Sequence, residues 1–293
     1  MHPAVVELFD RNGGFLGTPA LLRVMTRQQL DVRVRRGDLI RVWRGVYAPQ
    51  QPDYFGRLAA LDEYIGQRAV ACLGTAAWLY GFDTEAVSAV HVLDPGRRVR
   101  PAVGLMIHQR LGAPLSLVRG RLATAPAWTA VEVARQLPRP RALATLDAAL
   151  HSGLCTAPDL KKAAHEQWGR RGIVAVRGLL PLADGRAESA MESEARLAML
   201  DHAVPMPELQ YVIDAGDRWR VDFAWPEFRV AAEYESIDWH AGRIEMLRDK
   251  ERFAGIQHAG WTVIPIVVTD VRLRPDLMAD RIMTHLARGG YPG

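Results

Sequence analysis

Three carboxylates and a histidine gather in a short stretch near the C-terminus of the chain. The stretch is RVDFAWPEFRVAAEYESIDWH, residues 220–240; its polar positions include Asp222, Glu233 and Glu235, and His240 follows five residues later. Carboxylate oxygens are the ligands that Mg²⁺ prefers, and a bound metal polarises a phosphodiester and lowers the pKa of an attacking water. A histidine beside such a site can shuttle a proton. The stretch therefore raises the hypothesis of metal-dependent nuclease chemistry.

The apolar residues around these acids alternate as they do in two neighbouring strands. Residues 219–225 and 228–235 each place apolar side chains at every second position, which predicts an antiparallel hairpin. If the two residues between the runs form the turn, Asp222 lies opposite Ala231, and residues that lie opposite each other point to the same face. Asp222 and Glu233 are then diagonal neighbours on that face. The pattern predicts two carboxylates within reach of one ion.

A helix on either side of the hairpin completes an α/β layout. Residues 189–203 predict a helix that carries Glu192, and residues 243–259 predict a second helix, which a buried strand and a closing helix follow. Glu192 supplies a third oxygen ligand, so the predicted Mg²⁺ ligands are Asp222, Glu233 and Glu192. The plain alternative is that these acids lie on a solvated face of the sheet.

Positive charge is concentrated near the N-terminus. Between Arg23 and Arg44 the chain has seven arginines and two aspartates, an excess of five positive charges, whereas the formal net charge of the whole chain is +4. A basic segment of this kind is the electrostatic footprint expected of a nucleic-acid binder, and the alternative is a solvated surface of a small packing domain. The elements that carry the arginines favour the first interpretation.

The basic segment has the start and stop signals of a small helical unit. A first helix stops at Gly13, and Thr18, which precedes a proline, begins a second. Thr26 can cap a third helix that runs to Arg36 and ends at Gly37. Two short alternating runs follow, at residues 39–43 and 45–48. Three helices followed by a two-stranded ribbon is the order of a winged helix-turn-helix.

A winged helix binds duplex DNA with its third helix in the major groove and its ribbon along the backbone. Arginine suits both positions because its guanidinium pairs bidentately with guanine or with phosphate. We expect Arg27, Arg33 and Arg36, at spacings of six, three and nine, to share roughly one side of the third helix. We expect Arg41 and Arg44 of the ribbon to contact phosphates.

The composition is that of an ordinary globular protein. Of 293 residues, 49% are hydrophobic and 24% are charged, so the chain is long enough for two or three domains and is not of the disordered class. No apolar run approaches the ~20 residues of a membrane helix, and the N-terminus lacks the features of a signal peptide. Cys72 and Cys155 form no CxxC motif. We therefore expect a cytoplasmic protein without a membrane partner.

Longer stretches of the chain resemble known families. The segments ESAMESEARL, RVDFAWPEFRVAAEYESIDWH and RDKERFAGIQHAGWTVIPI resemble the domain related to very-short-patch-repair endonucleases, in the PD-(D/E)XK nuclease superfamily. MTRQQLDVRVRRGDLIRVWRGVYA resembles the winged helix of AbiEi-type antitoxins of type IV toxin–antitoxin systems. GTAAWLYGF, TAPAWTAVEVAR and LDAALHSG are similar to actinobacterial proteins that join these two parts. The resemblance implies a DNA-binding antitoxin that represses its own operon and is usually encoded beside a nucleotidyltransferase-type toxin.

The resemblance also implies roles for the acids. By position, Asp222 and Glu233 match the metal-binding acids of the nuclease motif, and Glu192 matches its helix glutamate. The superfamily's lysine, two residues after the second acid, is Glu235 here, which adds negative charge where a scissile phosphate must come. A metal-dependent DNA endonuclease is therefore the alternative function, with Asp222, Glu233, Glu235 and His240 as its catalytic residues. A third hypothesis is a non-catalytic protein whose C-terminal domain docks a partner.

The predicted fold class is α+β or α/β, in three regions. We expect a winged helix in residues 1–50, a mixed α/β antitoxin-like region in residues 51–183 and a restriction-endonuclease-like α/β domain in residues 184–293. The expected partners are double-stranded DNA and a nucleotidyltransferase toxin, and Mg²⁺ is the cofactor only if the nuclease site works.

Overall fold

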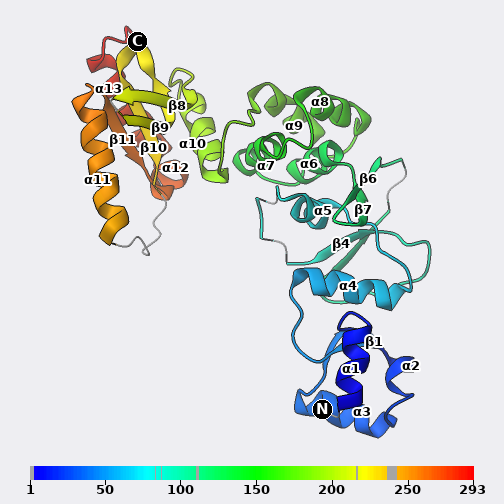
Figure 1. Ribbon diagram of the computed structural model, residues 1–293. Helices are drawn as coiled ribbons and strands as arrows, with labels where there is room; N and C mark the ends of the chain where they lie inside the picture. Colours follow the sequence, from blue (N-terminus) through cyan, green and yellow to red (C-terminus); the bar gives the residue numbers. More distant parts are fainter. Residues whose placement is uncertain (1–2, 83, 87, 110–111, 216, 236–242) are drawn as a thin grey trace. The chain divides into compact units, whose positions relative to one another are not determined.

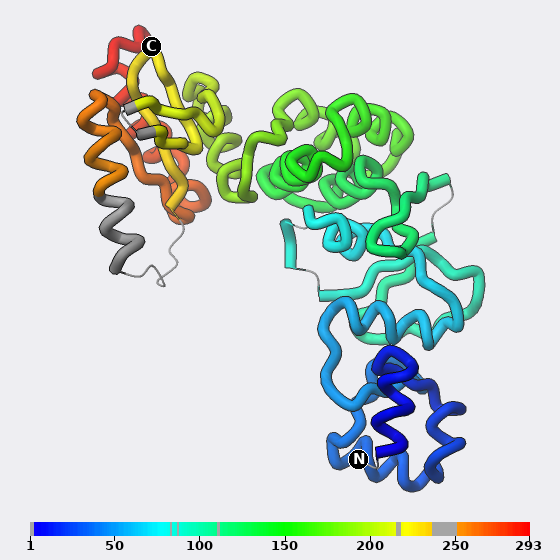
Figure 2. The backbone as a smooth tube through the Cα atoms, in the orientation of Figure 1, coloured from blue at the N-terminus to red at the C-terminus, as the bar shows by residue number. Residues whose placement is uncertain are grey.

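The chain folds into two compact units that both contain helices and sheets. The computed structural model describes residues 3–82, 84–86, 88–109, 112–215, 217–235 and 243–293. Figure 1 labels the elements, and Figure 2 follows the backbone by residue number. The units are residues 1–129 and 130–293, so the predicted middle region is shared between them. The mixed composition of elements confirms the predicted α+β class. In the described part of the chain, no helix combines the length and the apolar character needed to cross a membrane.

The first unit begins with three helices and a small sheet. Their bounds are α1 Pro3–Arg11, β1 Leu16–Gly17, α2 Thr18–Leu21, α3 Arg27–Arg36, β2 Ile40–Trp43 and β3 Val46–Ala48. The strands pair antiparallel in the order β1-β3-β2. A buried cluster that includes Phe9, Leu21, Leu30 and Tyr47 holds the helices against the sheet. The predicted order of three helices and a ribbon is confirmed, and β1 is an element that the sequence did not indicate.

The rest of the first unit adds two helices and two pairs of strands. Their bounds are α4 Tyr54–Ile65, α5 Leu73–Tyr80, β4 Val90–Leu93, β5 Leu105–His108, β6 Leu115–Val118 and β7 Arg121–Thr124. β4 and β5 are parallel, whereas β6 and β7 form an antiparallel hairpin that the sequence analysis missed. Thr124 is the last residue of β7. Its hydroxyl lies 2.7 Å from that of Thr129 in the interior.

The second unit opens with a helical layer. Its elements are α6 Pro126–Ala134, at the boundary between the units, then α7 Arg139–His151, α8 Ala157–Glu166, α9 Ile173–Leu179, η1 Leu180–Leu182 and α10 Ala190–Asp201. α7 packs along α10, and Arg196 of α10 pairs with Asp147 of α7 at 2.7 Å. The Arg196 guanidinium also donates to the carbonyl of Leu182 at 2.6 Å. This helical layer therefore folds together with the sheet that follows it.

A four-stranded mixed sheet forms the rest of the second unit. The elements are β8 Glu208–Ala215, β9 Asp217–Trp225, η2 Pro226–Phe228, β10 Val230–Tyr234, α11 Arg243–His258, β11 Thr262–Ile266, α12 Val268–Leu273 and α13 Pro275–Arg288. The strand order is β11-β10-β9-β8, with β10 and β11 parallel and the other neighbours antiparallel. The predicted α/β layout is confirmed, with α12 as an additional short helix.

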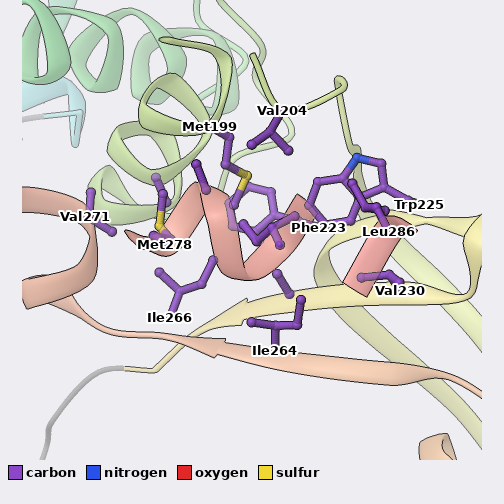
Figure 3. Packing of buried hydrophobic residues seen from close by; sticks show 14 of the residues in the cluster. Met199, Val204, Phe223, Trp225, Val230, Ile264, Ile266, Val271, Met278 and Leu286 are labelled. Atoms are coloured by element: carbon purple, nitrogen blue, oxygen red, sulfur yellow. The ribbon is translucent and has the colours of Figure 1, made fainter. Parts of the chain in front are cut away.

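Helices cover both faces of this sheet. Alternate strand residues such as Phe223 and Val230 enter a core with Met199 of α10 and with Met278 and Leu286 of α13 (Figure 3). A second buried cluster contains Ala224, Ala231 and Ile256, the last from α11. It also contains Val221 of β9, so the alternation along β9 is interrupted between Val221 and Phe223. Figure 1 accordingly shows α11 on one side of the strands and α10 on the other. Glu233 has the same parity as Ala231 and pairs with Arg252 of α11, so it belongs to the α11 face. Asp222 lies at the interruption in β9.

Candidate nucleic-acid interface and carboxylate site

A groove between α3 and the β2–β3 ribbon carries four of the seven arginines between Arg23 and Arg44. Its volume is about 620 Å³, and its lining residues are Thr18, Arg27, Asp31, Val34, Arg35, Arg41, Arg44, Gly45 and Tyr47. Four of these nine are arginines, and two different elements contribute them. A concave surface with several guanidinium groups is suited to phosphate and base edges, because each guanidinium offers a fork of donors.

The ends of α3 are fixed by local hydrogen bonds. Thr26 and Gln29 form a capping box, in which the Thr26 hydroxyl accepts from the Gln29 amide at 3.2 Å and the Gln29 side chain accepts from the Thr26 amide at 2.8 Å. Gly37 closes the helix with φ of 78°, a conformation that favours glycine. Leu30 is fully buried and fixes the rotation of the helix. The sequence predicts this helix correctly because all its determinants are local.

The rotation of α3 decides which arginines enter the groove. Arg27, Asp31 and Arg35 recur every four residues and therefore lie on one face, toward the ribbon. Arg27 and Asp31 form an exposed ion pair at 3.6 Å. Because exposed pairs of this kind contribute little, the Arg27 guanidinium stays available to another anion.

Arg33 and Arg36 do not line this groove. The expectation that they share one side of α3 with Arg27 is wrong, since nine residues are two and a half helical turns and bring Arg36 to the opposite side from Arg27. Arg35, which the sequence analysis passed over, takes their place. Its spacing of eight from Arg27, just over two turns, is the signal that could have identified it.

The ribbon presents the other two predicted arginines. Arg41 lies on β2, and Arg44 lies in the turn before Gly45, whose φ of 75° favours glycine. The carbonyl of Gly45 accepts from the backbone N–H of Thr18 at 2.7 Å and from its hydroxyl at 3.1 Å, which ties the turn to the start of α2. The structure thus brings Arg41 and Arg44 together with Arg27 as the sequence predicts.

The predicted carboxylates lie on neighbouring strands in a different register from the expected one. Ala231 pairs with Ala224 and Ala232 with Phe223, where the ladder between β9 and β10 ends. The expected pairing of Asp222 with Ala231 is wrong by two residues. The connection is longer than a two-residue turn: η2 is a short 3-10 helix, and Arg229 follows it with φ of 52°. The two acids nevertheless lie close together, because Asp222 accepts a hydrogen bond from the backbone N–H of Tyr234, the residue after Glu233.

Each of these acids already has protein partners. One oxygen of Asp222 accepts from the backbone N–H of Tyr234 at 2.9 Å. Glu233 forms an ion pair with Arg252 of α11. One oxygen of Glu192 accepts from the Glu188 backbone N–H and from the Gln210 side chain, both at 3.0 Å.

Burial raises the pKa of all three groups above the ordinary value. For Asp222 and Glu233, hydrogen bonds and the charge of Arg252 oppose the effect of burial without cancelling it. For Glu192, the neighbouring charge of Asp222 adds to burial. The mutual electrostatic influence of these carboxylates indicates a single acidic cluster.

This cluster does not fit the predicted metal site. Among the residues that the structure describes, no three His, Cys, Asp or Glu side chains are placed so that they could hold one ion. The oxygens of Asp222, Glu233 and Glu192 instead accept from N–H groups of the protein itself. Glu235 is exposed at the end of β10, and its charge contributes to the raised pKa of Glu233. His240 lies outside the described residues.

Known proteins are similar to this chain in two ways: one family model matches its middle part, and two relatives align with most of its length. Residues 69–182 match the family model of the AbiEi antitoxin C-terminal domain. The chain is 68% identical over 271 residues to uncharacterised proteins of two Mycobacterium tuberculosis strains, CDC 1551 and H37Rv, and the alignment spans 92% of this chain and 100% of each relative. The chain therefore belongs to the same family as these mycobacterial proteins, and its central part resembles the AbiEi antitoxin C-terminal domain.

Proposed function

We propose that this protein is a DNA-binding antitoxin that represses the operon encoding it together with a nucleotidyltransferase-type toxin. The observation that carries the DNA-binding part is the groove in which Arg27, Arg35, Arg41 and Arg44 converge from a capped helix and a ribbon. The antitoxin part rests on the family match of residues 69–182. In this proposal residues 3–48 act as a winged helix, with α3 in the major groove and the ribbon along the backbone.

DNA binding is tested with the full chain and the duplex that lies upstream of its own gene. Fluorescence anisotropy compares this duplex with a scrambled duplex of equal length at two salt concentrations. We expect tighter binding to the upstream duplex and a fall of affinity with salt, because released counterions drive the phosphate contacts. Equal affinity for both duplexes would exclude a specific repressor.

The groove is tested by charge-neutral substitution. A variant with Arg27→Gln, Arg35→Gln, Arg41→Gln and Arg44→Gln should lose binding to both duplexes. A matched variant with Arg33→Gln and Arg36→Gln changes the same helix outside the groove and should keep most of its affinity. If the fourfold variant binds as tightly as the unmodified protein, the groove is not the interface.

The antitoxin role has a separate test. A neighbouring gene for a nucleotidyltransferase is first sought on the same transcript and then expressed alone and together with this chain. We expect growth arrest from the neighbour alone and rescue by co-expression. No arrest, or no rescue by the intact chain, would contradict the antitoxin role and leave the DNA-binding result standing by itself.

A further inference from the structure

Arg252 of α11 contacts the acidic cluster. Its guanidinium pairs with the Glu233 carboxylate and also donates to the backbone carbonyl of Arg220 at 2.8 Å. Glu233 belongs to β10 and Arg220 to β9, so one guanidinium joins α11 to both central strands. The same charge lowers the pKa of Asp222 against the effect of burial, which indicates that Arg252 lies near both carboxylates.

The approach of α11 to the sheet is close at this point. Ile256 is fully buried in the cluster with Ala224 and Ala231. One position earlier, a Cβ on Gly255 would lie 3.1 Å from Nε1 of Trp219, so glycine allows the helix to pack tightly there. Arg252 is three residues before Gly255 and one helical turn before Ile256. The packing therefore fixes the backbone that carries Arg252 over the two acids.

Among the described residues, another basic side chain of the strands, Arg220, is paired elsewhere. Arg220 pairs with Glu188 at 2.7 Å, and both side chains are substantially exposed. Glu233, in contrast, is buried, with 9% of its side chain exposed, and a buried carboxylate requires a charged or hydrogen-bonding partner. Arg252 supplies that partner within the protein.

We propose that the Arg252 guanidinium is a built-in counter-ion that takes the place of a divalent cation at Asp222 and Glu233. The domain thereby keeps two neighbouring carboxylates beside α11 without a metal. A divalent cation competes with Arg252 for the same oxygens, so removing the guanidinium converts the closed pair into a cation site. Two carboxylates with bound water are sufficient ligands for Mg²⁺ or Mn²⁺.

The test measures Mn²⁺ binding to the full chain by the loss of the free-ion electron paramagnetic resonance signal. The unmodified protein should show no saturable binding below about 1 mM, the weak end of carboxylate cation sites. Arg252→Met keeps the aliphatic stem and removes the charge, and it should bind Mn²⁺ at least about tenfold more tightly. Adding Asp222→Asn to Arg252→Met should abolish the new binding.

Two controls keep the result interpretable. Arg218→Met removes an exposed arginine from the same strand as Asp222 and should leave Mn²⁺ binding unchanged. Circular dichroism and urea unfolding establish that each variant folds, and Arg252→Gln replaces Arg252→Met if the latter does not. The proposal is overturned if the unmodified protein already binds Mn²⁺ through Asp222, or if neither Arg252 variant binds Mn²⁺ more tightly than Arg218→Met.

Discussion

Asp147 and Arg196 form an ion pair in which only 1% and 2% of the respective side chains are exposed. Asp147 belongs to α7, within the segment that matches the antitoxin domain, whereas Arg196 belongs to α10, which packs on the C-terminal sheet. The other Asp147 oxygen accepts from the backbone N–H of Asp184 at 2.8 Å. Such a pair joins the helical layer and the sheet into one folded unit, and a cut between residues 183 and 184 would separate its partners.

We predict that Arg196→Met destabilises the second unit by roughly 3–5 kcal/mol, because it leaves the Asp147 carboxylate buried without a counter-ion. Adding Asp147→Asn removes that charge and keeps an acceptor for the Asp184 amide, so it should recover a large part of the loss. Urea unfolding of the two variants measures the difference. A double variant no more stable than Arg196→Met would show that the loss does not arise from an unpaired buried charge.

The buried carboxylate of Glu194 should make the free energy of unfolding depend on pH. Burial raises the pKa of Glu194, but hydrogen bonds from Arg272 and Arg141 outweigh it, and the pKa lies below the ordinary value. A lowered folded-state pKa contributes stability that is present at neutral pH and is lost as the pH falls through that pKa. We expect Glu194→Gln to lower the free energy of unfolding by about 2 kcal/mol at neutral pH, and less in acid.

Urea unfolding of the unmodified protein and of Glu194→Gln at several pH values between neutral and acid measures this difference. Glu227→Gln changes an exposed acid in η2 and should have little effect on stability at neutral pH. A difference for Glu194→Gln that grows as the pH falls would contradict the assigned role of the carboxylate.

We expect the stability of the second unit to depend on the glycine at position 172. It precedes α9 with φ of 83°, and a Cβ there would lie 2.2 Å from the carbonyl oxygen of Arg135. We expect Gly172→Ala to cost at least about 2 kcal/mol, since strain and backbone overlap add. Gly178→Ala, inside α9 with open space around it, should be neutral or stabilising by up to about 1 kcal/mol. Thermal unfolding of both variants measures the difference in stability. Similar unfolding midpoints would contradict the expected strain at position 172.

The arginines of the ribbon and those of α3 should contribute differently to DNA binding. Arg41→Ala and Arg44→Ala should weaken binding to all duplexes alike and reduce the slope of log K against log salt by about 0.9 for each phosphate that the variant no longer neutralises. Arg35→Ala should instead narrow the gap between the upstream duplex and a scrambled one, because a helix in the major groove reads base edges. An unchanged salt slope in both ribbon variants would place the backbone contacts elsewhere.

Elements with local determinants were predictable, and tertiary relationships were not. Thr26 and Gly37 mark both ends of α3 within the sequence itself, so that helix was placed correctly. The β6–β7 hairpin was missed although Arg119 and Gly120, both with positive φ, form a turn between alternating runs. The dipeptide at this turn was a usable signal.

The carboxylate site shows the other limit. Alternation predicts that Asp222 and Glu233 lie near each other on neighbouring strands, but the pairing of β9 with β10 depends on η2 and on the positive φ of Arg229, which no residue-type preference reveals. Arg252 pairs with Glu233 from an element 19 residues further along the chain, and only folding brings α11 over the strands. The sequence therefore shows the acids but not the arginine that pairs with Glu233.

The connection between β9 and β10 also constrains how the family can vary in length. Removing one of its residues would reverse the parity of β10, turning Glu233 into the core of Figure 3 and Val230 toward α11. Removing or inserting two residues would move every partner along the strand and leave each side chain on its own face. Insertions and deletions of two residues should therefore be tolerated in this connection better than those of one residue. An alignment of many relatives should contain gaps of even length at this position.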